Sequence, residues 1–297
     1  MQIAYYPGCT LKNKALNFEE STILSLRELG IELDELEHWN CCGTVFSFTT
    51  DNVIYHLAPI RNLIRTREKD ATKLLTLCSM CFNTLRRAHQ LFIEDHEKRK
   101  KIDGIMDKEE VKYDGKVDVV HLLEVLRDDV GFEKIREKTE QRLKDLKVAA
   151  YYGCMLVRPE GVGIDDMEEP RIFEDFVELT GAEAVNFPHK TECCGSYQTV
   201  TCPEVVAERT HTIINSARQG GADALVVSCP LCAFNLDHRQ KMTKERNISF
   251  TPLPILYLSE LLCLALGINL KQTWRDLHYI PLENIDKKLS VTAGRGV

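Results

Sequence analysis

The sequence predicts an α/β protein built from two similar, Rossmann-like halves, each with a parallel sheet. Three observations lead to this expectation: an internal repeat, an alternation of strand-like and helix-like segments in each copy, and short apolar runs typical of buried parallel strands. The chain has 297 residues and 44% hydrophobic content, which is enough for about two domains. We therefore expect an internal duplication with pseudo-symmetric halves.

Four ordered pairs of segments define the repeat. Because they keep their order and nearly keep their spacing, chance similarity is a poor explanation. The pairs are "YYPGC" and "YYGC" from Tyr5 and Tyr151, "CCG" at Cys41 and Cys193, "LLTLCSMCFNTL" and "LVVSCPLCAFNL" from Leu74 and Leu225, and "VHLLEVL" and "LYLSELL" from Val120 and Leu256. The expected domains are residues 1–146 and 147–297, with a charged helical hinge segment at 89–116.

Within the first copy, apolar alternation and helical spacing predict five elements in order. They are a strand over 2–6 ending at Pro7-Gly8, a helix over 15–30 stopped by Gly30, a strand over 31–36, a helix over 54–71 containing Pro59, and a buried strand over 73–77. The second copy repeats the order with a strand over 148–154, a helix over 171–181, a strand over 182–188, a helix over 205–221 and a strand over 224–229.

All the repeated cysteines follow predicted strands. Ligands of open parallel sheets bind beyond the carboxyl ends of the strands. We therefore expect two cysteine sets, one per half. They are Cys9, Cys41, Cys42, Cys78 and Cys81 in the first half, and Cys154, Cys193, Cys194, Cys229 and Cys232 in the second.

Composition excludes several other classes of function. The net charge is −7 and basic residues do not gather on one face, which argues against nucleic acid as a partner. The longest apolar stretch, 255–268, contains Ser259 and Glu260 and is too short for a bilayer of about 30 Å. The N-terminus has no signal-peptide pattern, so we expect a cytoplasmic protein without a membrane segment. Twelve cysteines in that compartment indicate metal or redox chemistry.

Five thiols per set is more than one zinc ion or one cubane [4Fe–4S] cluster uses, since each takes four ligands. A polynuclear iron–sulfur cluster, with vicinal cysteines on neighbouring irons, suits the number better. Gly43 and Gly195 allow a sharp turn beneath such a group. Zinc with one spare cysteine remains an alternative. Cys202 and Cys263 lack a repeat partner, and we expect them to be ordinary buried residues.

The pattern of one cysteine, then "CCG", then two cysteines separated by two residues resembles the duplicated cysteine-rich CCG domain family over almost the whole chain. Within that family it is most similar to the B subunits of heterodisulfide reductases of methanogenic archaea. Other members occur in glycolate, lactate, glycerol-3-phosphate and fumarate oxidoreductases. Both copies here are complete.

The resemblance implies an oxidoreductase in which each five-cysteine set holds a noncubane [4Fe–4S] cluster. The two clusters would reduce the heterodisulfide of coenzyme M and coenzyme B (CoM-S-S-CoB) to two thiols, each giving one electron and capturing one sulfur. The resemblance also implies two partner subunits of the reductase, one ferredoxin-like and one a flavoprotein, with hydrogenase or formate dehydrogenase in a larger complex. The chain has no glycine-rich flavin or nicotinamide motif of its own.

Two other functions stay open. A CCG protein can be only an electron-transfer component of another anaerobic oxidoreductase. A thioredoxin-like mechanism at Cys78/Cys81 and Cys229/Cys232 would use low-pKa thiolates, but it leaves the other six repeated cysteines without a role.

An anionic substrate needs cations, which recognise it through charge-assisted hydrogen bonds. The basic residues nearest the cysteines in sequence are the candidates for this role: Lys12, Lys14, Arg158, His189 and Lys190.

Overall fold

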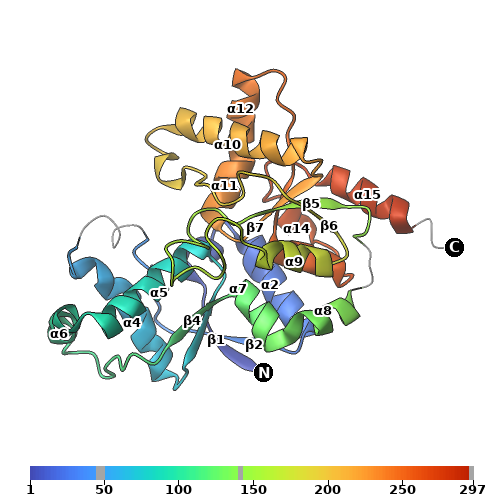
Figure 1. The fold of residues 1–297 in the computed structure, drawn as a ribbon. Coiled ribbons are helices and arrows are strands. Elements are labelled where there is room, and N and C mark those ends of the chain that lie inside the picture. Colours follow the sequence, from blue (N-terminus) through green and yellow to red (C-terminus); the bar gives the residue numbers. More distant parts are fainter. Residues whose placement is uncertain (45–50, 140–142, 294–297) are drawn as a thin grey trace.

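The computed structural model describes residues 1–44, 51–139 and 143–293, with the side chains of 291–293 left undescribed. It contains two four-stranded parallel sheets, one in each half of the chain, with strand orders β2-β1-β3-β4 and β6-β5-β7-β8. Each order places the first strand of its half in the centre, and the same strand positions recur in both sheets (Figure 1). The expectation of an α/β fold with two pseudo-symmetric parallel-sheet halves is confirmed.

The first half forms one sheet and the helices around it. Its strands are β1 (Gln2–Tyr6), β2 (Glu32–Glu35), β3 (Lys73–Thr76) and β4 (Asp118–His121). Its helices are α1 (Gly8–Leu11), α2 (Leu16–Glu28), α4 (Ile54–Glu68), α5 (Ser79–Glu94), α6 (His96–Ile105), α7 (Leu122–Glu124), a π-helical turn (Val125–Gly131) and α8 (Phe132–Lys138).

The second half repeats this plan. Its strands are β5 (Lys147–Tyr151), β6 (Glu183–Val185), β7 (Ala224–Val227) and β8 (Ile255–Tyr257). Its helices are α9 (Ile172–Leu179), a 3-10 turn (Ser196–Gln198), α10 (Pro203–Gln219), α11 (Pro230–His238), α12 (Gln240–Arg246), α13 (Leu258–Ala265), α14 (Gln272–Arg275) and α15 (Glu283–Ala293).

The predicted elements form, and each half adds one strand that the sequence pattern left unassigned. These added strands, β4 and β8, pair in parallel with β3 and β7. Both end in the fourth repeated segment, where a strand of four or three residues is followed directly by a helix. Such a short run does not distinguish a strand from the start of a buried helix. The predicted strand over 182–188 is shorter than expected and ends at Val185.

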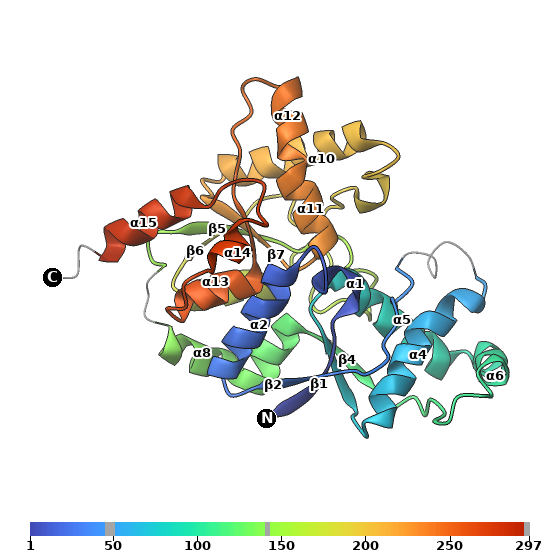
Figure 2. The same ribbon diagram turned by 180° about the vertical axis from the view of Figure 1, so that it is seen from behind.

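Two helix–helix contacts hold the halves together, and the internal repeat relates one contact to the other. Helix α2 of the first half lies beside α13 of the second (Figure 2), where Ser21 Oγ is 2.6 Å from Ser259 Oγ. The rings of Phe18 and Tyr257 stack at 4.3 Å in the same contact. In the reciprocal contact, α9 of the second half packs against α7 of the first. Small serine side chains let α2 and α13 approach closely, so the two halves share one core.

Among the described residues, the helices are all too short or too polar to cross a membrane.

Candidate metal centres

The carboxyl ends of three strands deliver the cysteines of the first half. Cys9 lies on α1, directly after β1, and Cys41 and Cys42 follow β2. Cys78 follows β3 and caps the N-terminus of α5, whose first turn carries Cys81. The positive end of a helix favours a thiolate, but hydrogen bonds to Cys229 and Cys42 together with burial raise the pKa of Cys78 and of Cys81.

The second half places its cysteines in the same way. Cys154 follows β5, and Cys193 and Cys194 follow β6. Cys229 caps the N-terminus of α11, whose first turn carries Cys232. In both halves the second cysteine of the adjacent pair and both cysteines of the later pair are buried.

The thiols of each half touch one another. Cys9 and Cys41 Sγ are 4.0 Å apart, and Cys42 and Cys81 Sγ are 3.5 Å apart. In the second half Cys194 and Cys232 Sγ are 3.4 Å apart. The remaining neighbours within each half also interact directly: Cys41 with Cys42, Cys78 with Cys81, Cys154 with Cys193, Cys193 with Cys194, and Cys229 with Cys232.

The two sets meet at the pseudo-twofold axis. There the thiols of Cys78 and Cys229 interact, which makes one continuous chain of ten sulfurs. The neighbouring residues add two hydrogen bonds, because Ser79 Oγ is 2.8 Å from Ser228 Oγ and Ser79 N–H donates to Ser228 O at 3.3 Å. Both serines are buried. The two cysteine sets are therefore held next to each other by polar contacts that water does not reach.

Each Cys-Cys-Gly turn points main-chain N–H groups at sulfur. Gly43 and Gly195 have φ of 84° and 80°, a conformation that favours glycine. Gly195 N–H donates to Cys193 Sγ at 3.3 Å, and Thr44 N–H donates to Cys42 Sγ at 3.4 Å. Hydrogen bonds from neighbouring thiols and from these turns lower the pKa of Cys41 and of Cys193 to about 2. The bond to Cys41 raises the pKa of Cys42 to about 12, so within each Cys-Cys pair these contacts favour anionic sulfur at the first cysteine and a thiol at the second.

The donor chemistry fits an iron–sulfur group. Each set offers five sulfur atoms, and cluster ligands are thiolates. Within the described residues, no three His, Cys, Asp or Glu side chains are arranged to hold a single metal ion. The sulfurs instead form a row of pairwise contacts, and the five thiols of each set exceed the four ligands that a single zinc ion takes.

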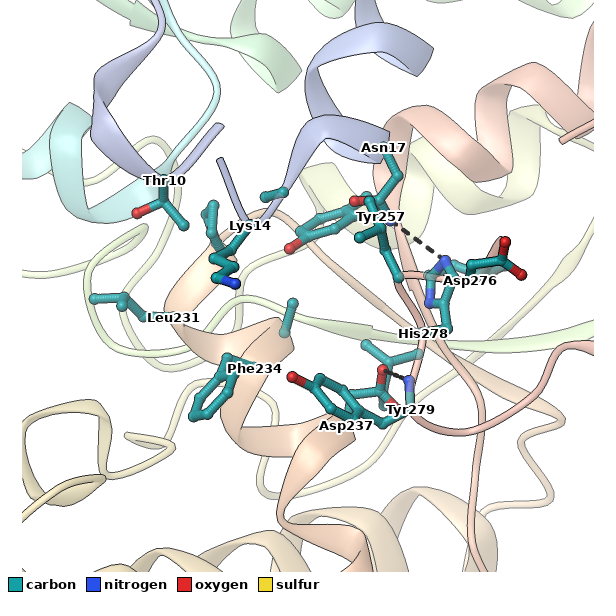
Figure 3. Close-up of a pocket in the computed structure, with 16 residues that line it drawn as sticks. Thr10, Lys14, Asn17, Leu231, Phe234, Asp237, Tyr257, Asp276, His278 and Tyr279 are labelled. Atoms are coloured by element: carbon teal, nitrogen blue, oxygen red, sulfur yellow. Dashed lines mark hydrogen bonds between the residues drawn. The ribbon is translucent and has the colours of Figure 1, made fainter. Parts of the chain in front are cut away.

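A cavity of about 410 Å³ lies between the two halves, next to both sets. Thr10, which follows Cys9, lines it from the first half, and Pro230 and Leu231, which lie between Cys229 and Cys232, line it from the second. Figure 3 shows Phe234 and Tyr257 on its walls, with Lys14 reaching in from the first half. The walls are mainly aromatic and aliphatic.

The C-terminal segment 276–279 closes the far side of the cavity. Asp237 accepts hydrogen bonds from the N–H groups of Tyr279 and Ile280 at 2.8 and 2.9 Å. His278 Nε2 lies 3.0 Å from Glu260 Oε1. The sequence analysis missed these wall residues, because 276–279 lies far from every cysteine in the sequence. The sequence feature that could have pointed to this wall was Glu260, a carboxylate within an apolar run, which contacts His278.

Of the five predicted basic residues, Lys14 alone lines this cavity. Its side chain is exposed, and no carboxylate in the described part of the chain lies within ion-pair distance of it. Lys14 is therefore available to an anionic group of a ligand.

Lys12 and Lys190 instead neutralise buried carboxylates. Lys12 Nζ lies 2.7 Å from Glu19, which also accepts the Tyr5 hydroxyl. Lys190 Nζ lies 2.5 Å from Glu174, which accepts the Tyr152 hydroxyl. Each half thus contains one Tyr–Glu–Lys triad, and each triad ties its first strand to the following helix.

The last two candidates are also engaged. Arg158 donates to Thr191 O at 2.9 Å and pairs with Glu168 at 2.8 Å. His189 Nδ1 lies 2.8 Å from Glu192 Oε1. Arg158 and His189 thus bind the two residues that directly precede the second Cys-Cys pair.

The two unpaired cysteines lie outside the sets. Cys263 is buried on α13 and donates to Ser21 O at 3.3 Å, within the contact between the halves. Burial raises the pKa of Cys263 to about 12, so it remains a thiol. Cys202 is half-buried before α10.

Two known proteins are similar to this chain over nearly its whole length. A chain from Wolinella succinogenes, the membrane anchor subunit of 8-methylmenaquinol:fumarate reductase, is 34% identical over 91% of this chain and 94% of its own. The B subunit of ferredoxin:CoB-CoM heterodisulfide reductase from Methanosarcina mazei is 28% identical over 99% of both chains. Both relatives are components of oxidoreductases.

A solved structure of a hypothetical protein from Helicobacter pylori has the same fold, with a TM-score of 0.74 and 13% identity. The match covers 94% of this chain and 51% of that one. The family model of the cysteine-rich domain named CCG matches residues 3–86 and 148–237, which span one cysteine set each. The chain therefore belongs to the CCG cysteine-rich domain family and carries two copies of the domain.

Proposed function

We propose that the chain is an oxidoreductase subunit that holds two [4Fe–4S] clusters, of the noncubane type, and reduces the heterodisulfide of coenzyme M and coenzyme B. The ligands are the ten repeated cysteines, five per half. The ligand bound between the halves is the disulfide.

One observation carries this proposal: the two thiol sets touch at Cys78 and Cys229, and one cavity is lined by Thr10 and Pro230, which are next in sequence to cysteines of the two sets. Reducing a disulfide to two thiols consumes two electrons and two protons. When bound, each iron–sulfur cluster would supply one electron. Two one-electron centres beside one cavity therefore match the stoichiometry of the reaction.

The residues of the chain have separate tasks in this proposal. Lys14 binds an acidic group of the substrate by a charge-assisted hydrogen bond. Phe234 and Tyr257 pack against its apolar part and exclude water. The segment 276–279, fixed by Asp237, keeps the cavity closed on the side away from the thiols.

Electrons must reach the chain from partners, since the chain itself carries no flavin or nicotinamide motif. We propose a ferredoxin-like partner and a flavoprotein partner for this role, the C and A subunits of a heterodisulfide reductase, in a larger complex with hydrogenase or formate dehydrogenase.

The test is turnover by the isolated chain. The protein, purified without oxygen and assayed for iron, is given an artificial one-electron reductant and CoM-S-S-CoB. We expect two thiols per disulfide consumed. Iron-loaded protein that transfers electrons but leaves the disulfide intact would contradict the proposal.

A second candidate is quinol-linked electron transfer in a fumarate reductase. The name of the relative from Wolinella succinogenes and the mainly aromatic and aliphatic cavity walls favour it. Among the described residues, Lys14 is the one lysine or arginine lining the cavity, which is few for a ligand with several acidic groups. Reduction of the iron–sulfur signal by a menaquinol analogue, in protein that does not respond to the heterodisulfide, would select this candidate.

A further inference from the structure

A tyrosine at the end of the first strand stands beside the thiols in each half. Tyr6 is the last residue of β1 and Tyr151 the last residue of β5, and each precedes the first cysteine of its set by three positions. Both side chains are fully buried. The two tyrosines are therefore equivalent residues of the duplicated fold.

Both hydroxyl groups make the same hydrogen bond. Tyr6 donates to the carbonyl oxygen of Asn40 at 2.9 Å, and Tyr151 donates to that of Glu192 at 2.6 Å. Asn40 and Glu192 directly precede the two Cys-Cys pairs. Each bond thus fixes the peptide group from which a Cys-Cys-Gly turn begins.

The rings also form one wall of each thiol compartment. A Cβ atom on Gly8 would lie 3.2 Å from Cys81 Sγ and 3.4 Å from the Tyr6 ring. A Cβ atom on Gly153 would lie 3.3 Å from both Cys232 Sγ and the Tyr151 ring. Glycine at these positions lets the ring and the sulfur approach from opposite sides, so little space is left for water there.

We propose that Tyr6 and Tyr151 are positioning residues for the two iron–sulfur clusters. Each hydroxyl holds the Cys-Cys-Gly turn so that its N–H groups face sulfur, and each ring shields the cluster from water. This inference rests on the proposed function, because it presupposes that the thiol sets hold clusters.

The test compares Tyr6→Phe and Tyr151→Phe with the wild-type chain, each loaded with iron. Phenylalanine keeps the ring and removes the hydrogen bond, which is worth about 1 kcal/mol. We expect each variant to bind the normal amount of iron but to release about half of it roughly three- to tenfold faster to a ferrous chelator. The electron paramagnetic resonance spectrum should change for one cluster only.

Tyr5→Phe and Tyr152→Phe are matched controls. These neighbouring tyrosines are buried too, but their hydroxyl groups bond to Glu19 and Glu174. We expect normal iron release and a normal spectrum in both, even where the melting temperature falls.

The outcomes separate the inference from the proposed function. Wild-type protein that binds no iron would refute the proposed function. Iron-loaded Tyr6→Phe and Tyr151→Phe with wild-type release rates and spectra would refute the positioning role alone. Equal changes in the Tyr5 and Tyr152 controls would also refute it, because the effect would then reflect general loosening of the fold.

Discussion

The two halves carry equal sets of cysteines but differ in the segment that follows the first one. After Cys9 the chain turns into α2 at Leu16, whereas after Cys154 a longer segment, 155–171, precedes α9. This segment lies against α5 of the first half, where Asn83 donates to Met155 O at 2.8 Å and Gln90 donates to Gly161 O at 2.7 Å.

The longer segment makes the molecule asymmetric at its sites. It packs beside α5, which is the counterpart of α11 in the repeat, and α11 lines the cavity. Cys9 and Cys41 are exposed, whereas their counterparts Cys154 and Cys193 are half-buried. The two cysteine sets of the duplicated fold are therefore not equally exposed.

The strongest test of equivalence between the halves is to remove one cysteine from each. Cys42→Ala and Cys194→Ala should each lower the iron content from about eight to about four atoms per chain, because in the proposed function each set holds its own cluster. Iron and acid-labile sulfide analysis measures this. About two zinc ions and little iron in the parent protein would instead favour the zinc alternative.

The two Tyr–Glu–Lys triads should differ in their contribution to stability. The Lys190 side chain is 11% exposed and that of Lys12 is 35% exposed. Lys190→Met leaves Glu174 buried without its cation and should cost about 3 kcal/mol of unfolding free energy. Lys12→Met should cost less, about 1 kcal/mol, since water reaches the Lys12 side of this pair although Glu19 is buried. Urea unfolding checks both values, and equal losses would contradict this difference.

Asp237 on α11 occupies the position of Arg86 on α5 in the repeat, and it should make stability depend on pH. Burial raises the pKa of Asp237 to about 6, although the N–H of Tyr279 opposes this. A carboxyl with a raised pKa stabilises the fold at low pH, and this contribution is lost as the pH rises through 6.

Relative to Asp237→Asn, the wild-type chain should therefore lose roughly 2 kcal/mol of unfolding free energy between pH 4 and pH 7. His278 and Glu260 are present in both proteins, so the difference reports Asp237 together with its electrostatic coupling to these two residues. Urea unfolding across this range is the measurement. A difference that does not change with pH would contradict the raised pKa.

The smallest expected effect is on KM, and it compares Lys14, which lines the cavity, with Arg158, which lies in the longer segment 155–171. Lys14→Ala should raise KM for an anionic substrate about tenfold and leave the iron content unchanged, because one charge-assisted hydrogen bond is lost. Arg158→Ala should leave KM near the wild-type value, since Arg158 is bonded to Thr191 and Glu168. Steady-state kinetics checks the pair, and a larger KM effect for Arg158 would reverse this view of the cavity.

The sequence was sufficient for the fold class and for the grouping of ten cysteines, because both follow from a repeated pattern and from strand polarity. It was not sufficient for the direction of side chains, nor for the distance between the two cysteine sets. Lys12 and Lys190 lie close to cysteines in the sequence, yet they point at Glu19 and Glu174. Only the packing of strand on helix determines which side of the chain such a residue faces.

The cavity was beyond prediction for a related reason. Its walls combine α1, α11 and the segment 276–279, which come together only when the two halves dock. The tyrosine hydrogen bonds were hidden as well. Matching "YYPGC" to "YYGC" did not indicate which tyrosines correspond, whereas the structure pairs Tyr6 with Tyr151 through their common bond.

The contact between α2 and α13 has a consequence for how the chain is made. Helix α2 is synthesised well before the helix that covers it, which ends at Ala265. Until then Phe18 lacks its stacking partner Tyr257, and Ser21 lacks Ser259. Partly made chains that expose such surfaces are prone to misassembly. The first half therefore reaches its final packing only after the second half has been synthesised, so any group bound by the first cysteine set meets a closed site only then.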